Sequence, residues 1–322
     1  MRGAQKQPTD MNRPHPAPST ETARHRLQAI GLMLMAVALF SGLDTAAKYL
    51  VTREGLSVAQ VVWVRFVGQF VLLLMLVPAF GIMSAKALFT SNRLGLQLVR
   101  SVLMVGTTAF NFLALQHLRL DQTITIVFLA PLVVALLAGP LLGEWVGWRR
   151  IVAVMVGFCG VLIAVRPGLG AVHPAVLYAF AAMIVYALFM LLTRYMAHFD
   201  PPLVTLFFSM FVGTFCGAPL ALLDWHTPPD ALSWVLLCSL GILGGTGHWL
   251  FLHAYRLAPA STIAPFLYMQ ILTMVAFGFA VFGDLPDVWT LAGAAIIVAS
   301  GVYLVQRERS LAREVADATA LS

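Results

Sequence analysis

The segments HLRLDQTITI (residues 117–126) and AYRLAPASTI (residues 254–263) resemble each other at an offset of 137 residues, which pairs an arginine, a leucine, a threonine and an isoleucine. The similarity continues along both copies, since GEWVGWRRIVAVMVGFCGVLI, starting at Gly143, resembles GDLPDVWTLAGAAIIVASGVYL, starting at Gly283. Apolar runs can also match by chance, but the order of features around both matches favours a real repeat. The sequence therefore predicts two copies of one structural unit.

The composition is that of an integral membrane protein. Of the 322 residues, 60% are hydrophobic and 11% are charged, and the mean hydropathy is +0.87. Soluble domains contain about 45–50% apolar and about 25% charged residues. A helix crosses the apolar core of a bilayer in about 20 residues. We expect an all-α integral membrane protein with ten transmembrane helices at 27–48, 58–80, 96–116, 123–142, 151–165, 175–195, 203–223, 232–254, 262–282 and 288–305.

The ten expected helices divide evenly between the two copies. We expect the first copy at 27–166 and the second at 174–305, with polar cytoplasmic tails at 1–26, which we expect to be disordered, and at 306–322. Because five is an odd number, the second copy starts on the opposite side of the membrane from the first. Two inverted five-helix repeats are an architecture of secondary transporters, which bind substrate near the bilayer midplane between the halves.

The basic residues predict the orientation. Most of the 20 lysines and arginines lie in the tails and in the loops on the same side as the N-terminus. Positive residues mark the cytoplasmic side, so both termini are expected there. Because the charges are spread over separate loops, they do not predict binding to nucleic acid. The three cysteines lie in apolar runs without paired spacing, and we expect buried free thiols.

Three segments resemble the paired EamA domains of the drug/metabolite transporter superfamily: ALQHLRLDQTITIVFLAPLVVALLAGPLLGEWVGWRR, the later GVLIAVRPG, and APFLYMQILTMVAFGFAVFGDLPDVWTLAGAAIIVASGVYLVQRER. The resemblance covers residues 27–309, which is nearly the whole chain. It implies ten transmembrane helices, location in a bacterial inner membrane as a multi-pass protein, and transport of small organic solutes.

Within that superfamily, FGDLPD and the RF of the second span look most like carriers of larger metabolites, such as S-adenosylmethionine or riboflavin. Exporters of amino-acid metabolites or of a metallophore share the same plan. The second copy has Tyr268 where the first has Pro131, and Asp284 where the first has Glu144. Such imperfect symmetry is expected if the halves contribute differently to one site. We expect Glu144 and Asp284 to be structural, each beside the start of a helix.

Charged residues inside a span cost about 2.5–3.5 kcal/mol on insertion scales and usually face a cavity or a partner. Asp44 lies well inside the first span, and Lys48 follows one helical turn later on the same face. In one interpretation, Asp44 binds a proton or a cation, and Lys48 holds it in its ionised form. In the other, Asp44 only caps or pairs, and Lys48 extends to the membrane interface.

Two arginines are further candidates. Arg65, early in the second span, shares a helix face with Gln69. Its guanidinium could bind a carboxylate or phosphate of a substrate, or could pair with Asp44. Arg100, near the start of the third span, could line the same cavity or extend to the cytoplasmic interface.

Uncharged polar residues and prolines complete the set. Asn111 aligns with His248, which follows the GGTG segment, although a membrane histidine more often bonds a neighbouring helix than a ligand. Pro131 and Pro265 interrupt two spans, where they could line a cavity or form kinks. Tyr186 is expected to pack or to anchor at the interface. The expected substrate-binding or coupling residues are Asp44, Lys48, Arg65, Gln69, Arg100, Asn111, His248, Tyr268 and Gln270.

These features predict a secondary transporter in which two halves rock around a central site by alternating access. No GxxxxGKS or GxxxxGKT motif for ATP is present, so direct coupling to ATP is not expected. Coupling to protons at Asp44 or at a histidine is consistent with the resemblance to the superfamily. A membrane-embedded enzyme, a sensor or a channel is the weaker alternative, since neither a reactive motif nor an output domain occurs. The expected partners are a small-molecule substrate and the lipid bilayer, without cofactor, metal or nucleic acid. The sequence leaves open the substrate, the direction of transport and the oligomeric state.

Overall fold

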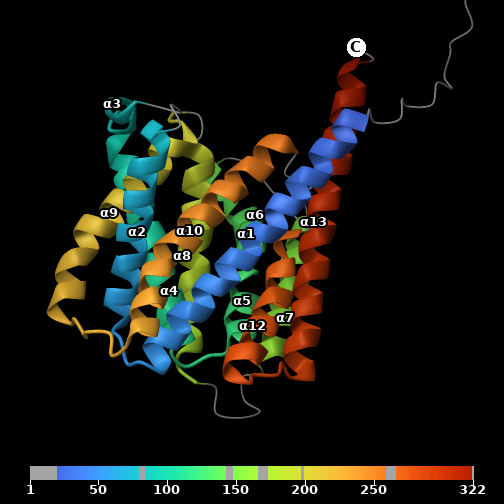
Figure 1. Ribbon diagram of the computed structural model, residues 1–322. Helices are drawn as coiled ribbons and strands as arrows, with labels where there is room; N and C mark the ends of the chain where they lie inside the picture. The colour runs from blue at the N-terminus through green and yellow to red at the C-terminus, as the bar shows by residue number, and fades with distance from the viewer. Residues whose placement is uncertain are drawn as a thin grey trace, which may run out of the picture.

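Backbone groups in a bilayer have no water to bond, so long apolar runs form helices. A computed structural model describes residues 20–79, 84–142, 148–165, 173–196, 199–258 and 266–320, in which no strand occurs. The elements form the bundle of Figure 1. They are α1 (Thr20–Thr52), α2 (Val58–Ala79), α3 (Ala85–Leu88), α4 (Leu94–Leu115), α5 (Leu120–Val127), α6 (Ala130–Leu142), α7 (Trp148–Val165), α8 (Val176–Met196), α9 (Pro202–Leu223), α10 (Ala231–Leu257), α12 (Met269–Phe282) and α13 (Val288–Ala320).

The helices differ in their capacity to cross a membrane. In the described part of the chain, six are long and apolar enough: α1, α2, α4, α8, α9 and α10. The other predicted spans correspond to shorter apolar stretches, at Leu120–Val134, Ile151–Ala164, Met269–Phe282 and Val288–Tyr303. The all-α prediction is confirmed. By length and composition alone, six of the ten predicted spans qualify as full-length in the described part of the chain.

The packing of the helices follows the predicted repeat. α1 packs along α10, and their counterparts in the other half, α8 and α4, pack along each other. In the same way, α2 packs on α10 as α9 packs on α4. α2 also packs on its own counterpart α9, and α7 on its own counterpart α13. This exchange of partners is what a two-fold relation between two five-helix units requires.

Both ends of the described chain lie at the same end of the bundle, where α1 begins and α13 finishes (Figure 1). We call this the tail end, and the opposite one the far end. α1 starts at Thr20 and α13 continues to Ala320, so both helices extend into the expected polar tails.

One span in each half is interrupted. The break between α5 and α6 falls at Phe128 and Leu129, close to Pro131, which has no backbone N–H to donate. In the other half a turn precedes α12 at Tyr268, the position aligned with Pro131. The ring centroids of Phe128 and Tyr268 lie 5.2 Å apart, so the two breaks meet inside the bundle. Pro265 and Glu144 lie outside the described residues.

Glycines on α10 let two neighbouring helices approach closely. A Cβ atom on Gly68 of α2 would lie 2.8 Å from the Cα of Gly241, which no real side chain tolerates. A Cβ on Gly244 would collide with the amide of Gln69. The close approach therefore fixes Gln69 of α2 against the middle of α10.

The free cysteines lie on the outside of the bundle. Cys159, Cys216 and Cys238 are all exposed and unpaired in the described chain. The expectation of buried thiols was wrong, because apolar faces of membrane helices also face lipid.

Candidate functional site

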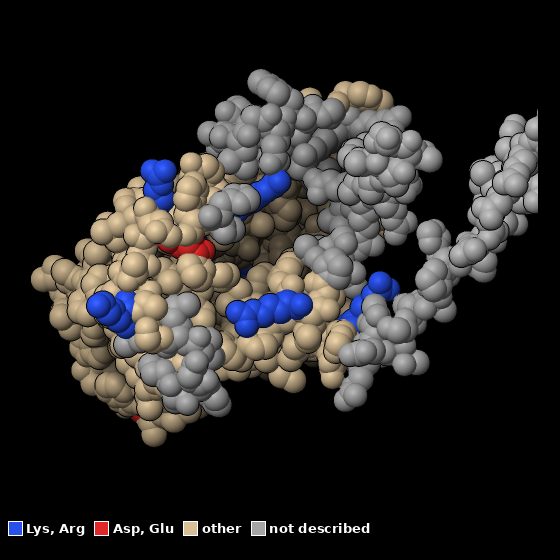
Figure 2. All heavy atoms as spheres, turned by 90° about the horizontal axis from the view of Figure 1, so that it is seen from above, with Lys and Arg blue, Asp and Glu red and all other residues tan. Residues whose placement is uncertain are grey.

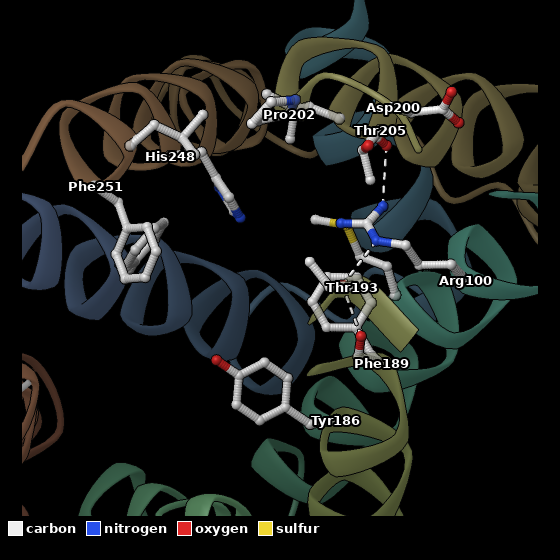
Figure 3. Close-up of a pocket in the computed structure, with 13 residues that line it drawn as sticks. Arg100, Tyr186, Phe189, Thr193, Asp200, Pro202, Thr205, His248 and Phe251 are labelled. Carbon is white, nitrogen blue, oxygen red and sulfur yellow. Dashed lines mark hydrogen bonds between the residues drawn. The ribbon is translucent and has the colours of Figure 1, made fainter. Parts of the chain in front are cut away.

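A cavity of about 250 Å³ lies between α1, α4, α8, α9 and α10. Asp200 and Pro202, on its lining, come from the segment leading into α9 at the tail end. Figure 2 shows that this end is hollowed over the middle of the bundle, with lysine and arginine side chains around the hollow. Figure 3 shows side chains from several helices converging on the cavity. Aromatic rings form much of its wall: Phe40, Tyr186, Phe189, His248 and Phe251.

Arg100 contributes the charge of this aromatic cavity. Its Nε donates to Thr193 Oγ1 at 2.7 Å, and its Nη1 donates to the carbonyl of Thr205 at 3.0 Å and to Ser209 Oγ at 2.7 Å. The guanidinium carbon lies 4.5 Å from the centroid of the Phe189 ring. Only 5% of Arg100 is exposed, so the side chain lies inside the bundle and does not extend to the interface.

His248 faces the same cavity from α10. Its Nδ1 lies 2.8 Å from the carbonyl oxygen of Gly244, so this nitrogen is the donor. The edge of the ring packs on Phe40, with centroids 4.9 Å apart. Figure 3 shows the imidazole directed into the cavity, where Nε2 is the atom left to meet a solute. The charges of Arg65 and Arg100 both act on this ring, so His248 is influenced by two charged regions.

The first of these regions is a group of buried polar residues around Asp44, which we call the Asp44 cluster. Asn111 Nδ2 donates to Asp44 Oδ1 at 3.4 Å. Arg65 attracts Asp44 electrostatically without forming an ion pair, and its Nη1 donates to Thr108 Oγ1 at 3.4 Å. Its guanidinium carbon lies 5.7 Å from the Phe112 ring centroid. The structure thus brings together α1, α2 and α4 through these residues.

Several atoms in the Asp44 cluster have no partner. Within the described chain, Arg65 Nε and both amide atoms of Gln69 are buried without a hydrogen bond. Gln69 is only 1% exposed. An unsatisfied buried polar group costs about 1–3 kcal/mol, so such groups indicate a place for water or a solute. These atoms lie on the shared face of α2 that the spacing of Arg65 and Gln69 predicts.

Lys48 does not contact Asp44. Its Nζ lies 3.3 Å from Asp284 Oδ2 and 4.6 Å from the centroid of the Phe282 ring. The predicted contact within α1 is wrong because Asp44 turns toward Asn111, while Asp284 offers Lys48 a carboxylate across the halves. The helix start of α13 is capped by Asp287, whose Oδ1 accepts from the N–H of Thr290 at 2.7 Å.

Lys48 belongs to a group of charges at the far end. Arg119 and Asp121 form an ion pair at 2.7 Å, and both act on the charge of Lys48. We call Lys48, Arg119, Asp121 and Asp284 the far-end charge cluster. It links α1 and α5 of the first half to the α12–α13 connection of the second.

Asp200 fixes the rim of the aromatic cavity. It accepts hydrogen bonds from Ser91 Oγ at 2.6 Å, the backbone N–H of Asn92 at 2.9 Å and Gln97 Nε2 at 2.8 Å. Burial alone would raise the pKa of Asp200, but these bonds together hold it below its ordinary value. The carboxylate ties the segment before α4 to the segment before α9.

Of the nine predicted residues, Arg100 and His248 line the aromatic cavity, whereas Tyr268 and Gln270 belong to none of the groups described above. Tyr268 packs on Phe128, and Gln270 lies in α12, where its backbone carbonyl accepts from Thr273. Conversely, Tyr186 lines the cavity, although the sequence favoured packing or anchoring at the interface. Phe40, Phe189 and Phe251 were missed, since phenylalanine is frequent throughout the apolar runs.

Comparisons with known proteins address the whole chain. The profile of the EamA-like transporter family matches residues 27–166 and 173–306. An S-adenosylmethionine uptake transporter of Rickettsia conorii is 28% identical over 284 residues, which are 88% of this chain and 94% of the relative. A riboflavin transporter of Vibrio cholerae is 28% identical over 290 residues, covering 90% and 96%.

More distant similarities agree with the fold. A pseudopaline exporter of Pseudomonas aeruginosa is 23% identical over 296 residues, covering 87% of this chain and 97% of the relative. One solved structure, described only as the crystal structure of a protein, has a TM-score of 0.61 at 17% identity. It covers 87% of this chain and 98% of its own, and it shows a shared fold alone.

Proposed function

Because the chain belongs to the EamA-like transporter family of the drug/metabolite transporter superfamily, and is therefore a multi-pass membrane transporter of small molecules, we propose that it carries a planar aromatic metabolite by alternating access. The aromatic cavity carries this proposal. Its walls are contributed by both halves: Phe40, Arg100 and Met104 from the first, and residues of α8, α9 and α10 from the second. Aromatic rings bind a planar solute by stacking and edge contacts.

The mechanism that we propose uses the difference between the two ends. The aromatic cavity is reached from the tail end, and the far-end charge cluster closes the opposite end. Rocking of the halves would break the contact between Lys48 and Asp284 and close the tail end around the substrate. The substrate would then leave or enter on the far side.

We propose that the tail end is cytoplasmic and that the membrane is the bacterial inner membrane. Arg26, Lys86, Arg93, Arg194 and Arg256 are all exposed, and the positive-inside rule assigns such a surface to the cytoplasm. Figure 2 shows basic side chains around the hollow at this end. The conformation described above would then be open to the cytoplasm.

We further propose that the Asp44 cluster couples transport to a proton. Asp44 is only 9% exposed, bonds Asn111 and lies beside Arg65, so a change in its charge would alter contacts between three helices. His248 lines the aromatic cavity and is also influenced by the charge of Arg65. Gln69 and Arg65 supply unpartnered atoms that a solute or water could bond during the transition. No chemical reaction is required of these residues, so an enzymatic role is not part of the proposal.

Counterflow in proteoliposomes tests the proposal. Vesicles containing the purified protein would be loaded with unlabelled riboflavin or S-adenosylmethionine, the cargoes named for its relatives, and exposed to the labelled compound. We expect transient, saturable accumulation that protein-free vesicles do not show. Vesicles loaded with other aromatic metabolites extend the test to the exporter alternative. If no planar solute produced counterflow while the protein remained folded, the proposed cargo class would be wrong.

A further inference from the structure

Arg100 is a buried cation without an acidic partner. Its three hydrogen bonds go to a threonine hydroxyl, a serine hydroxyl and a backbone carbonyl, which are all neutral. Among the described residues, the ion pairs join Lys48 to Asp284 and Arg119 to Asp121, both in the far-end charge cluster. A buried charge is normally paired, because its hydration is lost. The charge of Arg100 is therefore left for something that enters the cavity.

The acid nearest to this part of the cavity does not neutralise Arg100. Asp200 also lines the cavity, but its oxygens accept from Ser91, Asn92 and Gln97 at the rim. Gln97 Nε2 lies between the two regions and bonds both Asp200 and Thr205 Oγ1. Asp200 and Arg100 thus share neighbours without forming an ion pair.

The guanidinium is also oriented for a ligand. Nε and Nη1 make all of its hydrogen bonds in the described chain, and Phe189 stacks against it. The two N–H groups of Nη2 are left over, and Arg100 lines the cavity. Figure 3 shows the guanidinium of Arg100 and the imidazole of His248 directed into the same space from opposite walls. A guanidinium that is held in place loses little freedom when it binds an oxyanion.

The charges of the interior as a whole favour an anion. Among the described residues, the aromatic cavity and the Asp44 cluster together contain two cations, Arg65 and Arg100. They contain two acids, Asp44 and Asp200, and Asp200 is bonded at the rim. Asp44 is therefore the one acid left to balance two cations. An anionic solute would balance this interior. A cationic solute would add a third positive charge to a buried region, where like charges repel strongly.

We propose that the substrate carries a carboxylate or phosphate group beside its planar ring, and that Nη2 of Arg100 binds this anion while the aromatic wall holds the ring. This inference rests on the proposed function, because it defines the cargo of the same cavity. S-adenosylmethionine, the cargo named for one relative, carries a carboxylate together with a sulfonium and an ammonium group, so it is a net cation. Riboflavin, the cargo named for another, is neutral. Neither has the net negative charge that would neutralise Arg100.

A charge series on one ring tests the inference by binding alone. Indole-3-propionate, tryptophan and tryptamine share the indole ring and are an anion, a zwitterion and a cation. Binding to the full-length protein in detergent would be measured by calorimetry. We expect indole-3-propionate to bind about tenfold or more tightly than tryptamine, with tryptophan in between, because a bond to a charged group contributes about this much. Equal affinities, or tighter binding of tryptamine, would exclude a carboxylate, and together with equal binding of riboflavin and flavin mononucleotide they would overturn the inference.

A second comparison tests for a phosphate and uses riboflavin and flavin mononucleotide. The two compounds share one ring system and differ by one phosphate on the side chain. A preference for the mononucleotide without a preference for indole-3-propionate would assign the anion as a phosphate, and the reverse would assign a carboxylate. Arg100→Gln should remove either preference, whereas Arg100→Lys should retain a part of it. The series on the unmodified protein decides the question even if Arg100→Gln does not fold. Because binding is measured without transport, failure of counterflow would contradict the proposed function and leave this test intact.

Discussion

The two ends of the bundle hold the halves together by different means. At the tail end, Arg100 of α4 bonds neutral groups on α8 and α9 beside an open aromatic cavity. At the far end, Lys48 and Asp284 join the halves by opposite charges. A carrier that alternates must open one end while the other is closed. Under the proposed mechanism, the far end is the closed gate, held by opposite charges, and the tail end is the open gate beside the binding region.

Permanent closure of the far end should have the largest effect. Lys48→Cys and Asp284→Cys would be combined in a protein whose natural cysteines are replaced by serine, and joined with a bifunctional thiol reagent. We expect transport to fall to background, because the far end can no longer open, while substrate still binds from the tail end. Counterflow and calorimetry would measure the two effects. Each single-cysteine variant treated with the same reagent is the control, and retained transport in the cross-linked protein would contradict the sealed-gate assignment.

Removal of the charge at Asp44 should have the next largest effect. Asp44→Asn keeps the size of the side chain and its contact with Asn111. We expect transport to decrease by about tenfold or more, equivalent to about 1.4 kcal/mol, and to lose its dependence on a proton gradient. Uptake into proteoliposomes with and without a pH gradient would measure this. Asp224→Asn, at an exposed position after α9, is the matched control. Unchanged flux and pH dependence would exclude Asp44 as the coupling residue.

A weakened far-end gate should have a moderate effect. Lys48→Met leaves Asp284 without its partner, and exchange of the two residues by Lys48→Asp and Asp284→Lys restores opposite charges. Partly exposed ion pairs contribute about 0–1 kcal/mol, so we expect far-end accessibility to rise by up to about fivefold in Lys48→Met. Labelling of a cysteine placed at Thr45 by an impermeant thiol reagent would report it. The exchanged pair should return labelling toward the original rate; no difference between the variants would show that the pair is not part of the gate.

Substitution of Asp200, at the rim of the tail end, should have the smallest effect on transport. We expect it to change the stability of the folded protein instead. Hydrogen bonds to charged groups contribute about 1.5–3 kcal/mol, so Asp200→Asn should lower the free energy of unfolding by about 1–3 kcal/mol at neutral pH. Because the pKa of Asp200 is held low in the folded protein, its contribution is present above the ordinary value of about 3.9 and is lost as pH falls through the folded pKa.

Thermal unfolding in detergent between pH 3 and pH 7 would follow this difference. The gap between Asp200→Asn and the unmodified protein should narrow toward the acidic end, whereas Asp224→Asn should match the unmodified protein throughout. A gap that does not change with pH would mean that the ionised carboxylate of Asp200 is not what stabilises the rim.

The repeat was the most informative feature of the sequence. It predicted two related five-helix units, and the packing of α1 with α10 and of α8 with α4 agrees with such a relation. It also aligned Pro131 with Tyr268, and a break lies at or close to each of them. A break in a membrane helix can be stabilised by neighbouring helices, and Tyr268 packs there on Phe128 and against Gly301.

The candidate site was predictable only in part. Buried charges are rare in apolar helices, so Asp44, Arg65 and Arg100 stood out in the sequence. The partner of Lys48 was not predictable, since Asp284 is 236 residues away while Asp44 is one turn away on the same helix. The aromatic wall was hidden for another reason: phenylalanines facing a cavity and phenylalanines facing lipid look the same in a sequence.

Sided labelling of one cysteine tests the alternating-access mechanism most directly. Leu252 lines the aromatic cavity without bonding any charged residue, so Leu252→Cys in the cysteine-free protein reports access to it. An impermeant thiol reagent would be added to inside-out and right-side-out membrane vesicles. Without substrate, we expect the cysteine to be labelled faster from the tail end. When substrate moves the two halves into the other state, labelling from the far end should become faster. Two results would contradict the mechanism. Equal labelling from both sides would show that the cavity does not open to one end at a time, and faster labelling from the far end without substrate would show that the tail end is not the open one.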